Sequence, residues 1–121
     1  MNIRQGDIFW VDLGDPRGSK PGFRQPYVVV QNNVFNLSRL NTAVLCVVTS
    51  NLARAKGPGN VLLRKGEGNL PKESVVNITQ IITVDKTDLV EKIGSLRRTR
   101  INQIIDGVKL LLEPREPEIP G

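Results

Sequence analysis

Short runs of β-branched and aromatic residues recur along the chain, and turns rich in glycine, proline and asparagine separate them. Runs of this kind are typical of β-strands. They predict six strands: Asp7–Leu13, Pro26–Gln31, Thr42–Thr49, Val61–Arg64, Ser74–Val84 and Leu89–Ile93. The second run is continuously apolar over Val28 to Val30, which indicates a strand buried on both faces. The polar segment from Asn32 to Asn41 is expected to hold a short turn.

The run from Ser74 to Val84 is the longest, and its alternation favours one face for the core. The residues on that face are Val76, Ile78, Gln80, Ile82 and Val84. Gln80 is the one polar member of this set. Two interpretations of it stay open: a buried hydrogen-bonding residue or a residue with a functional contact.

Helical periodicity appears only near the C-terminus. The residues that form an apolar stripe there are Ile101, Ile104, Ile105, Val108, Leu111 and Leu112. They predict a helix over about 98–112 that Pro114 ends. Gly107 weakens this helix by about 1 kcal/mol relative to alanine. Arg97, Arg98 and Arg100 stand at its start, the wrong sign for the helix dipole, and we interpret them as a solvated turn rather than a functional contact.

Six short strands followed by one helix, in 121 residues, predict a single small domain of mainly β structure. We expect a barrel-like antiparallel sheet with the C-terminal helix packed on it, over residues 1–113. Residues 114–121 have three prolines and no core-forming pattern, so we expect a flexible tail.

The composition limits the chemistry. Histidine is absent and Cys46 is the single cysteine, so neither an imidazole acid–base pair nor a zinc site is expected. No disulfide within the chain is possible, and the apolar neighbours of Cys46 indicate a buried, inert thiol with a raised pKa. The start of the chain has no secretory signal pattern, and the apolar runs are too short to cross a membrane. We expect a cytoplasmic protein.

Positive charge is concentrated in one stretch. The net charge is +5, from 17 basic and 12 acidic residues. Between Pro16 and Gly66 there is no aspartate or glutamate, but there are eight basic residues: Arg17, Lys20, Arg24, Arg39, Arg54, Lys56, Arg64 and Lys65. This asymmetry indicates a polyanionic partner, and a solvated basic face without a ligand is the alternative.

A series of motifs resembles one known family. The segments are Gly6–Leu13, Gly18-Ser19, Gly22–Asn32, Val48–Asn51, Asn69–Val76 and Gln80–Lys86. In this order they resemble the MazF/PemK toxins, and the similarity extends from Gly6 to about Leu112. No single motif is specific, whereas the whole series is.

The resemblance implies an SH3-like small barrel of the MazF/PemK/CcdB toxin type with a C-terminal helix. It implies a homodimer whose substrate groove crosses the subunit interface. The expected activity is sequence-specific endoribonuclease cleavage of single-stranded RNA, usually mRNA, through attack of the 2′-hydroxyl, with no metal or other cofactor. A cognate acidic antitoxin is the expected protein partner and blocks the groove.

The resemblance also implies a catalytic pair: an arginine beside the proline that opens the second strand, and a threonine that ends the third. The matching residues are Arg24 and Thr49. Many relatives have the arginine directly before the proline, where this chain has Gln25, and relatives commonly have an acid where it has Lys20. A guanidinium matches two phosphate oxygens and stays charged, and a hydroxyl adds a donor to the same phosphate.

Further RNA contacts are expected from the loops that flank this pair and from one strand residue. They are Ser19, Lys20, Gln25, Ser50, Asn51, Arg54, Lys56 and Gln80. Phe9 and Trp10 are expected in the core rather than as platforms for bases.

Two other functions are consistent with the pattern. The first is a non-catalytic toxin of the same fold that binds a topoisomerase, which would inhibit supercoiling without cutting RNA. The second is a basic RNA-binding barrel without turnover, which would bind RNA tightly and leave it intact.

Overall fold

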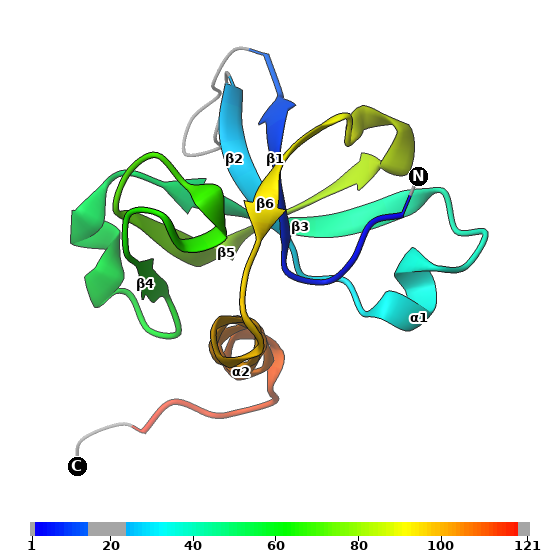
Figure 1. The fold of residues 1–121 in the computed structure, drawn as a ribbon. Helices are drawn as coiled ribbons and strands as arrows, with labels where there is room; N and C mark the ends of the chain where they lie inside the picture. Colours follow the sequence, from blue (N-terminus) through cyan, green and yellow to red (C-terminus); the bar gives the residue numbers. More distant parts are fainter. Residues whose placement is uncertain (1, 15–23, 119–121) are drawn as a thin grey trace.

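The computed structural model describes residues 2–14 and 24–118. Within them six strands form: β1 Asp7–Asp12, β2 Arg24–Val29, β3 Thr42–Thr49, β4 Val61–Leu63, β5 Ser74–Asp85 and β6 Glu91–Ser95. They make one antiparallel sheet in the order β4-β5-β3-β2-β1-β6. The sheet curls into a half-barrel, and helix α2, Arg98–Leu112, lies below it (Figure 1). The predicted mainly-β barrel with a C-terminal helix is confirmed.

Short helical turns occupy segments between the strands. They are α1 Asn33–Asn36, η1 Leu52–Lys56, η2 Glu67–Asn69 and η3 Lys86–Asp88. The first is the turn expected after β2, and the Asn32 side chain caps it by accepting from the N–H of Val34 at 2.7 Å. The η3 turn delays β6, which begins at Glu91 rather than at Leu89.

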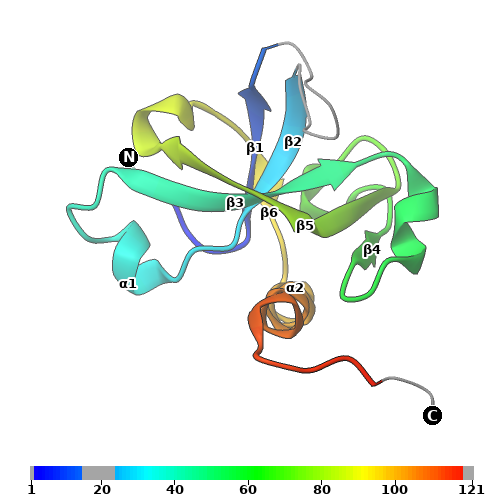
Figure 2. The same cartoon turned by 180° about the vertical axis from the view of Figure 1, so that it is seen from behind.

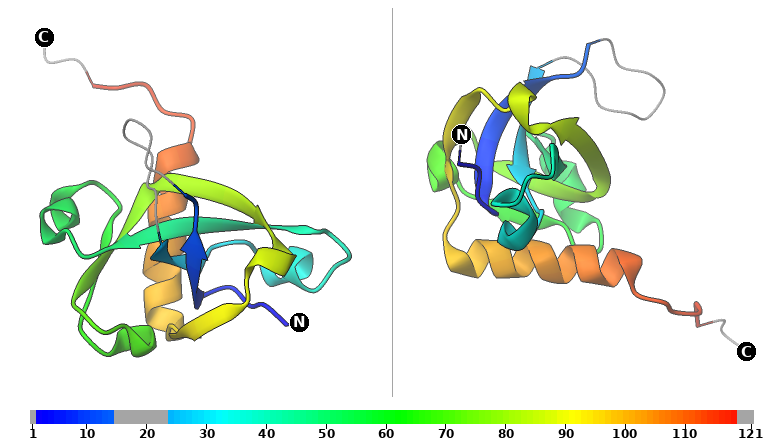
Figure 3. Two further views of the ribbon diagram at one scale, coloured as in Figure 1. Left: turned by 90° about the horizontal axis from the view of Figure 1, so that it is seen from above. Right: turned by 90° about the vertical axis from the view of Figure 1, so that its right-hand side faces the viewer.

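The sheet buries side chains on both faces, which explains its continuous apolar runs. Alternate residues of β2 and β3 enter different clusters: Val28 and Cys46 pack in one, whereas Val29 and Leu45 pack in the other. The first cluster includes Ile101 and Ile104 of α2. Figure 3 shows this helix running beneath the sheet. The second cluster includes Phe9 and Val11 of β1 and Leu89, which precedes β6.

The expectation that one alternating set on β5 faces a single core is wrong. The pairing of β5 with β3 shifts register between Cys46 and Val47, whose partners are Ile81 and Asn77. The extra residues of this bulge interrupt the alternation of faces. Val76 and Ile78 therefore pack in the first cluster, whereas Val84 packs in the second.

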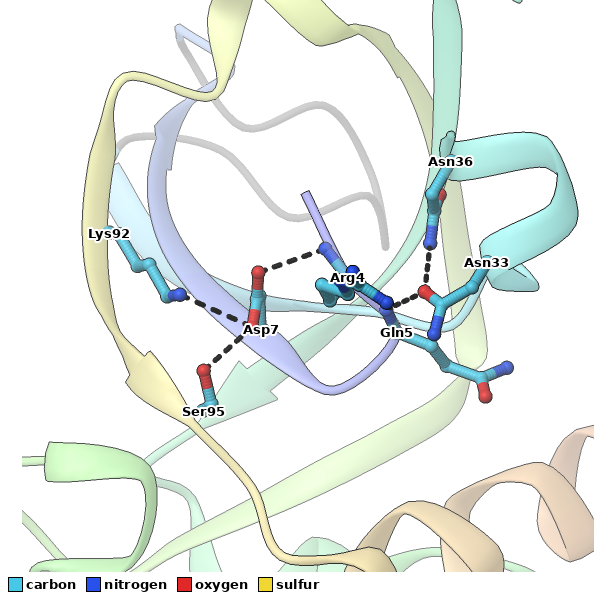
Figure 4. Close-up of polar contacts among 7 residues, drawn as sticks. All are labelled: Arg4, Gln5, Asp7, Asn33, Asn36, Lys92 and Ser95. Atoms are coloured by element: carbon cyan, nitrogen blue, oxygen red, sulfur yellow. Dashed lines mark hydrogen bonds and ion pairs between the residues drawn. The ribbon is translucent and has the colours of Figure 1, made fainter. Parts of the chain in front are cut away.

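A buried carboxylate on β1 binds the edge strand β6. Asp7 is 3% exposed, and its oxygens accept from the N–H of Arg4 at 2.9 Å and the hydroxyl of Ser95 at 2.6 Å. The ammonium of Lys92 lies 3.4 Å away (Figure 4). Because burying a charge is costly unless it is paired and hydrogen-bonded, these donors stabilise the contact between the N-terminal segment and β6.

A second contact joins the N-terminal segment to α1. The side-chain oxygen of Asn33 accepts from the N–H of Gln5 at 2.7 Å and from the buried Asn36 amide at 3.0 Å (Figure 4). The segment before β1 is thus fixed to two different elements.

Cys46 lies fully buried in the first cluster. Burial raises the pKa of its thiol to about 12, because a charged thiolate loses solvation there. The predicted buried thiol with a raised pKa is confirmed.

Gly107 of α2 lies directly against the backbone of Gly59. A Cβ atom at this position would clash with the carbonyl oxygen of Gly59, in the turn that precedes β4. The glycine that weakens the helix therefore lets the helix pack directly on this backbone.

We predict that Gly107→Ala destabilises the protein by about 1–3 kcal/mol, as overpacking of a tight contact does, although alanine is the better helix former. Urea unfolding monitored by circular dichroism measures the change. Asn102→Ala, at an exposed position of the same helix, is the control and should be neutral or slightly stabilising. A Gly107→Ala variant as stable as the wild type would contradict this packing.

Candidate active site

Antiparallel pairing brings four strand ends together. β2 begins at Arg24 and β3 ends at Thr49, and the pairing of Tyr27 with Val47 sets the start of β2 beside the end of β3. Thr49 itself pairs with Val75 at the start of β5, and Arg24 pairs with Asp12 at the end of β1. Figure 2 shows the end of β3 beside the start of β5.

A pocket of about 280 Å³ opens where these strand ends meet. The residues that line it are Trp10, Arg24, Gln25, Pro26, Val48, Thr49, Ser50, Leu70, Pro71, Lys72 and Ser74. Both members of the expected catalytic pair are among them. Arg24 is the first residue of β2 rather than a loop residue, so the sheet fixes its backbone.

Arg24 is held on two sides. Its Nη1 and Nη2 donate to the two carboxylate oxygens of Glu91 at 2.7 and 2.6 Å, and its guanidinium carbon lies 4.9 Å from the centre of the Trp10 ring. Trp10 pairs with Glu91 across β1 and β6, so the arginine side chain reaches across the indole to the carboxylate. The stacking is a cation–π contact, and together the contacts hold the guanidinium in one orientation.

The ion pair remains open to solvent, with the two side chains 48% and 52% exposed. The hydrogen bonds to Glu91 raise the pKa of Arg24, and the same bonds lower the pKa of Glu91. Both groups are therefore charged at neutral pH. A guanidinium has five N–H donors, and Glu91 takes two of them, so the remaining donors can bind an anion beside the carboxylate.

Thr49, the last residue of β3, contributes a hydroxyl group to the pocket. Its Oγ1 accepts from the N–H of Asn51 at 3.1 Å, so its own hydrogen can donate elsewhere. The Asn51 side chain in turn accepts from the N–H of Ala53 at 3.2 Å and caps η1. This chain of bonds fixes the turn that follows β3.

Of the expected RNA contacts, Gln25 and Ser50 line the pocket with the catalytic pair. Asn51, Arg54 and Lys56 lie exposed in and before η1, next to Ser50 but outside the pocket lining. Gln80 is half-buried beside the bulge of β5, and it is not among the lining residues either. Ser19 and Lys20 lie outside the described residues.

The expectation that Trp10 belongs to the core with Phe9 is wrong for Trp10. Phe9 and Val11 point into the second cluster, and Trp10, between them, points to the other face and lines the pocket half-exposed. Sequence reasoning also missed Glu91, because no pattern links it to Arg24. Lys72 and Ser74 lie in Asn69–Val76, one of the segments that resemble the family, so this resemblance could have indicated them as site residues.

The pocket combines cations and hydroxyls. Arg24 and Lys72 supply positive charge, and Thr49, Ser50 and Ser74 supply hydroxyl groups. Within residues 2–14 and 24–118, no group of three or more potential metal ligands from aspartate, glutamate and cysteine comes together. This set of side chains suits an anion such as a phosphodiester.

Comparison with known proteins decides the family. The sequence profile of the PemK-like, MazF-like toxins of type II toxin–antitoxin systems matches residues 4–112. The chain belongs to the PemK/MazF toxin family. Endoribonuclease MazF6 of Mycobacterium tuberculosis is 42% identical over 113 residues, which are 93% of this chain and 99% of that protein. Endoribonuclease MazF of Staphylococcus saprophyticus is 31% identical over 110 residues, 91% of each.

Solved structures of PemK/MazF toxins share the fold. An endoribonuclease from a mycobacterial species, solved in complex with its cognate antitoxin, superposes with a TM-score of 0.75 at 23% identity. The alignment covers 95% of this chain and 99% of that one. MazF from Deinococcus radiodurans gives a TM-score of 0.72 at 22% identity, over 93% and 97% of the two chains.

The stacking of Arg24 on Trp10, the single tryptophan, makes the ion pair measurable by fluorescence. We predict that Arg24→Ala increases acrylamide quenching of Trp10. Because Arg24 lowers the pKa of Glu91, the pair stays intact at and above the ordinary glutamate pKa of about 4.3. It separates only as the pH falls through the lowered value, and quenching then rises.

The control is Glu91→Gln, which should lack this pH-dependent step. A step centred above the ordinary glutamate pKa, or the same step in Glu91→Gln, would show that this pair does not hold Arg24 over the indole.

Proposed function

We propose that this PemK/MazF toxin is a metal-independent, sequence-specific endoribonuclease that cleaves single-stranded RNA, including mRNA, in the pocket of Arg24 and Thr49. Endoribonuclease is the activity named for relatives that are 42% and 31% identical. The observation that supports the site is that these two residues, 25 positions apart in sequence numbering, line one pocket.

In the proposed reaction the 2′-hydroxyl of one nucleotide attacks the adjacent phosphorus and loses its proton. The bond to the 5′-oxygen of the next nucleotide breaks, and that oxygen takes up a proton. The products are a 2′,3′-cyclic phosphate and a 5′-hydroxyl end. Negative charge grows on the non-bridging oxygens in the pentacoordinate state, so the protein acts by placing donors around them.

Arg24 supplies the main donors in this scheme. Its guanidinium stays charged throughout, and Glu91 and Trp10 hold it in place before the substrate arrives. Thr49 donates its hydroxyl to the same phosphate, and Lys72 adds positive charge at the pocket wall. Because Glu91 and Trp10 hold the guanidinium of Arg24 in a fixed orientation, little reorganisation is needed when charge develops.

The neighbouring residues would then bind the bases and flanking phosphates. We assign this role to Gln25 and Ser50 in the pocket, and to Asn51, Arg54 and Lys56 beside it. Gln80, on β5, and Ser19 and Lys20 remain proposed contacts on the basis of the family resemblance alone.

The proposed partners follow the family. One similar solved structure is an endoribonuclease in complex with its cognate antitoxin, and an acidic antitoxin segment would complement the positive charge of this chain. We propose a homodimer with the substrate groove across its interface.

No helix of the described residues is long and apolar enough to span a membrane, and we propose that the toxin acts in the cytoplasm, where Cys46 stays reduced. The topoisomerase alternative has no support among these endoribonuclease relatives.

We predict that Arg24→Ala and Thr49→Ala each lower kcat by about 10²–10³, the loss typical of one donor to a developing oxyanion. Cleavage of a panel of fluorogenic single-stranded RNAs in the presence of EDTA measures it. Thr49→Ser keeps the hydroxyl and should retain most activity, and Lys109→Ala, outside the pocket on α2, should match the wild type.

Full activity of both alanine variants would remove these residues from the mechanism. Loss of wild-type cleavage in EDTA would contradict a metal-independent reaction. Tight binding of RNA that remains intact under all conditions would favour the RNA-binding barrel without turnover.

A further inference from the structure

A second cleft, of about 470 Å³, lies between the connection from β4 to β5 and the segment that joins β6 to α2. The residues that line it are Arg64, Lys65, Gly66, Glu67, Gly68, Ser95, Leu96, Arg97 and Arg100. Four of these are cationic and one is acidic, so the lining carries an excess of three positive charges. We call it the arginine cleft.

The single carboxylate of the arginine cleft is already engaged. Arg100 donates to the two oxygens of Glu67 at 2.9 and 3.1 Å, which lowers the pKa of Glu67. Glu67 also accepts from the N–H of Arg64 at 2.7 Å. Arg100 is thus not part of a solvated turn, as its sequence position suggested, but part of the cleft wall.

The other three cations form no such ion pair, although the charge of Arg64 also contributes to the lowered pKa of Glu67. Arg64, Lys65 and Arg97 are exposed, and none of them makes an ion pair within the described part of the chain. Like charges gathered on one wall repel each other and destabilise the fold slightly. An anion in the cleft would relieve this repulsion.

The floor of the arginine cleft is rigid. The backbone of η2 packs so closely on β6 that a Cβ atom on Gly94 would clash with the carbonyl of Gly68. The Asn69 side chain also donates to the carbonyl of Ile93 at 3.0 Å. The cleft is therefore formed before any ligand binds, which lowers the entropic cost of binding.

One connection, from β4 to β5, lines both the arginine cleft and the pocket of Arg24 and Thr49. Residues 64–68 of the β4–β5 connection line the cleft, and Leu70, Pro71 and Lys72 of the same connection line the pocket. Lys72 at the pocket and Arg64 and Lys65 at the cleft therefore belong to one short connection between β4 and β5.

We infer that the arginine cleft binds the sugar–phosphate backbone of the substrate RNA outside the cleavage site. The inference rests on the proposed endoribonuclease function. Guanidinium groups match phosphate oxygens in a fork, and positively charged channels that follow the backbone are how proteins bind single strands without reading their sequence. The connection that the cleft shares with the proposed cleavage pocket favours RNA over an acidic protein segment as the occupant.

The test combines binding and cleavage for a series of single-stranded RNAs that share one cleavage site and lengthen on either side of it. The variant is Arg64→Ala/Arg97→Ala, which removes two exposed cations without touching the Glu67–Arg100 pair. The control is Lys109→Ala/Arg115→Ala, which removes the same formal charge outside both sites. Urea unfolding confirms that both proteins are folded.

The expected result is that kcat/KM of the variant falls at least tenfold on long RNAs that extend from one side of the site, and stays unchanged on the shortest RNA. The plot of log K against log salt concentration for long RNA should lose about 1.4 in slope, since each phosphate contact of a single strand contributes about 0.7. The control should keep the slope and activity of the wild type.

Equal slopes and equal kcat/KM on long RNA in a folded variant would overturn the inference while leaving the proposed cleavage intact. Wild-type behaviour on RNA together with lost binding of a polyglutamate peptide would assign the cleft to an acidic protein partner and overturn it as well. An equal loss on long and short RNAs would do the same, because the effect would then lie in the pocket. Failure of the wild type to cleave any RNA would instead overturn the proposed function.

Discussion

The antiparallel register of β2 between β1 and β3 is the constraint on which the site depends. It puts the first residue of β2 beside the last residues of β1 and β3, and the pairing of β3 with β5 adds the start of β5. Arg24, Thr49 and Ser74 are distant in sequence and meet for this reason alone. A shift of one residue along β2 would turn every side chain of that strand to the opposite face.

The hydrophobic pattern does not fix this register by itself, because the central strands are apolar on both faces. Specific polar and glycine contacts also help to align the strands. Asp7 accepts from Ser95 only when β1 and β6 are correctly aligned, and Gly94 passes Gly68 at a distance that no larger residue permits. These contacts fix the alignment of β6 with β1, and with it the position of Glu91 beside Arg24.

Much of the fold follows from the sequence, since the apolar runs and the one helical stripe report directly on strands and helix. The bulge in β5 does not, because both alternations of that strand are partly apolar and neither marks an extra residue. Arg24 and Thr49 are proposed through a family resemblance. The sequence gives no sign of Glu91, because its contact with Arg24 depends on β6 pairing with β1, which no local pattern reveals. The expectation for Trp10 was wrong because an aromatic residue in a strand is usually part of the core. Here its face of β1 lines the pocket, whereas Phe9 and Val11 on the other face pack in the second cluster.

We propose that the scissile phosphate binds between the guanidinium of Arg24 and the hydroxyl of Thr49. The most direct measurement is an NMR titration of the isotopically labelled protein with a substrate RNA that carries a 2′-deoxynucleotide before the scissile phosphate and cannot be cut. If the phosphate binds there, the largest shifts are expected at the Arg24 side-chain N–H groups, the Thr49 and Ser50 amides and the Trp10 indole. Saturating binding with these signals unchanged, and shifts confined to other surfaces, would contradict it.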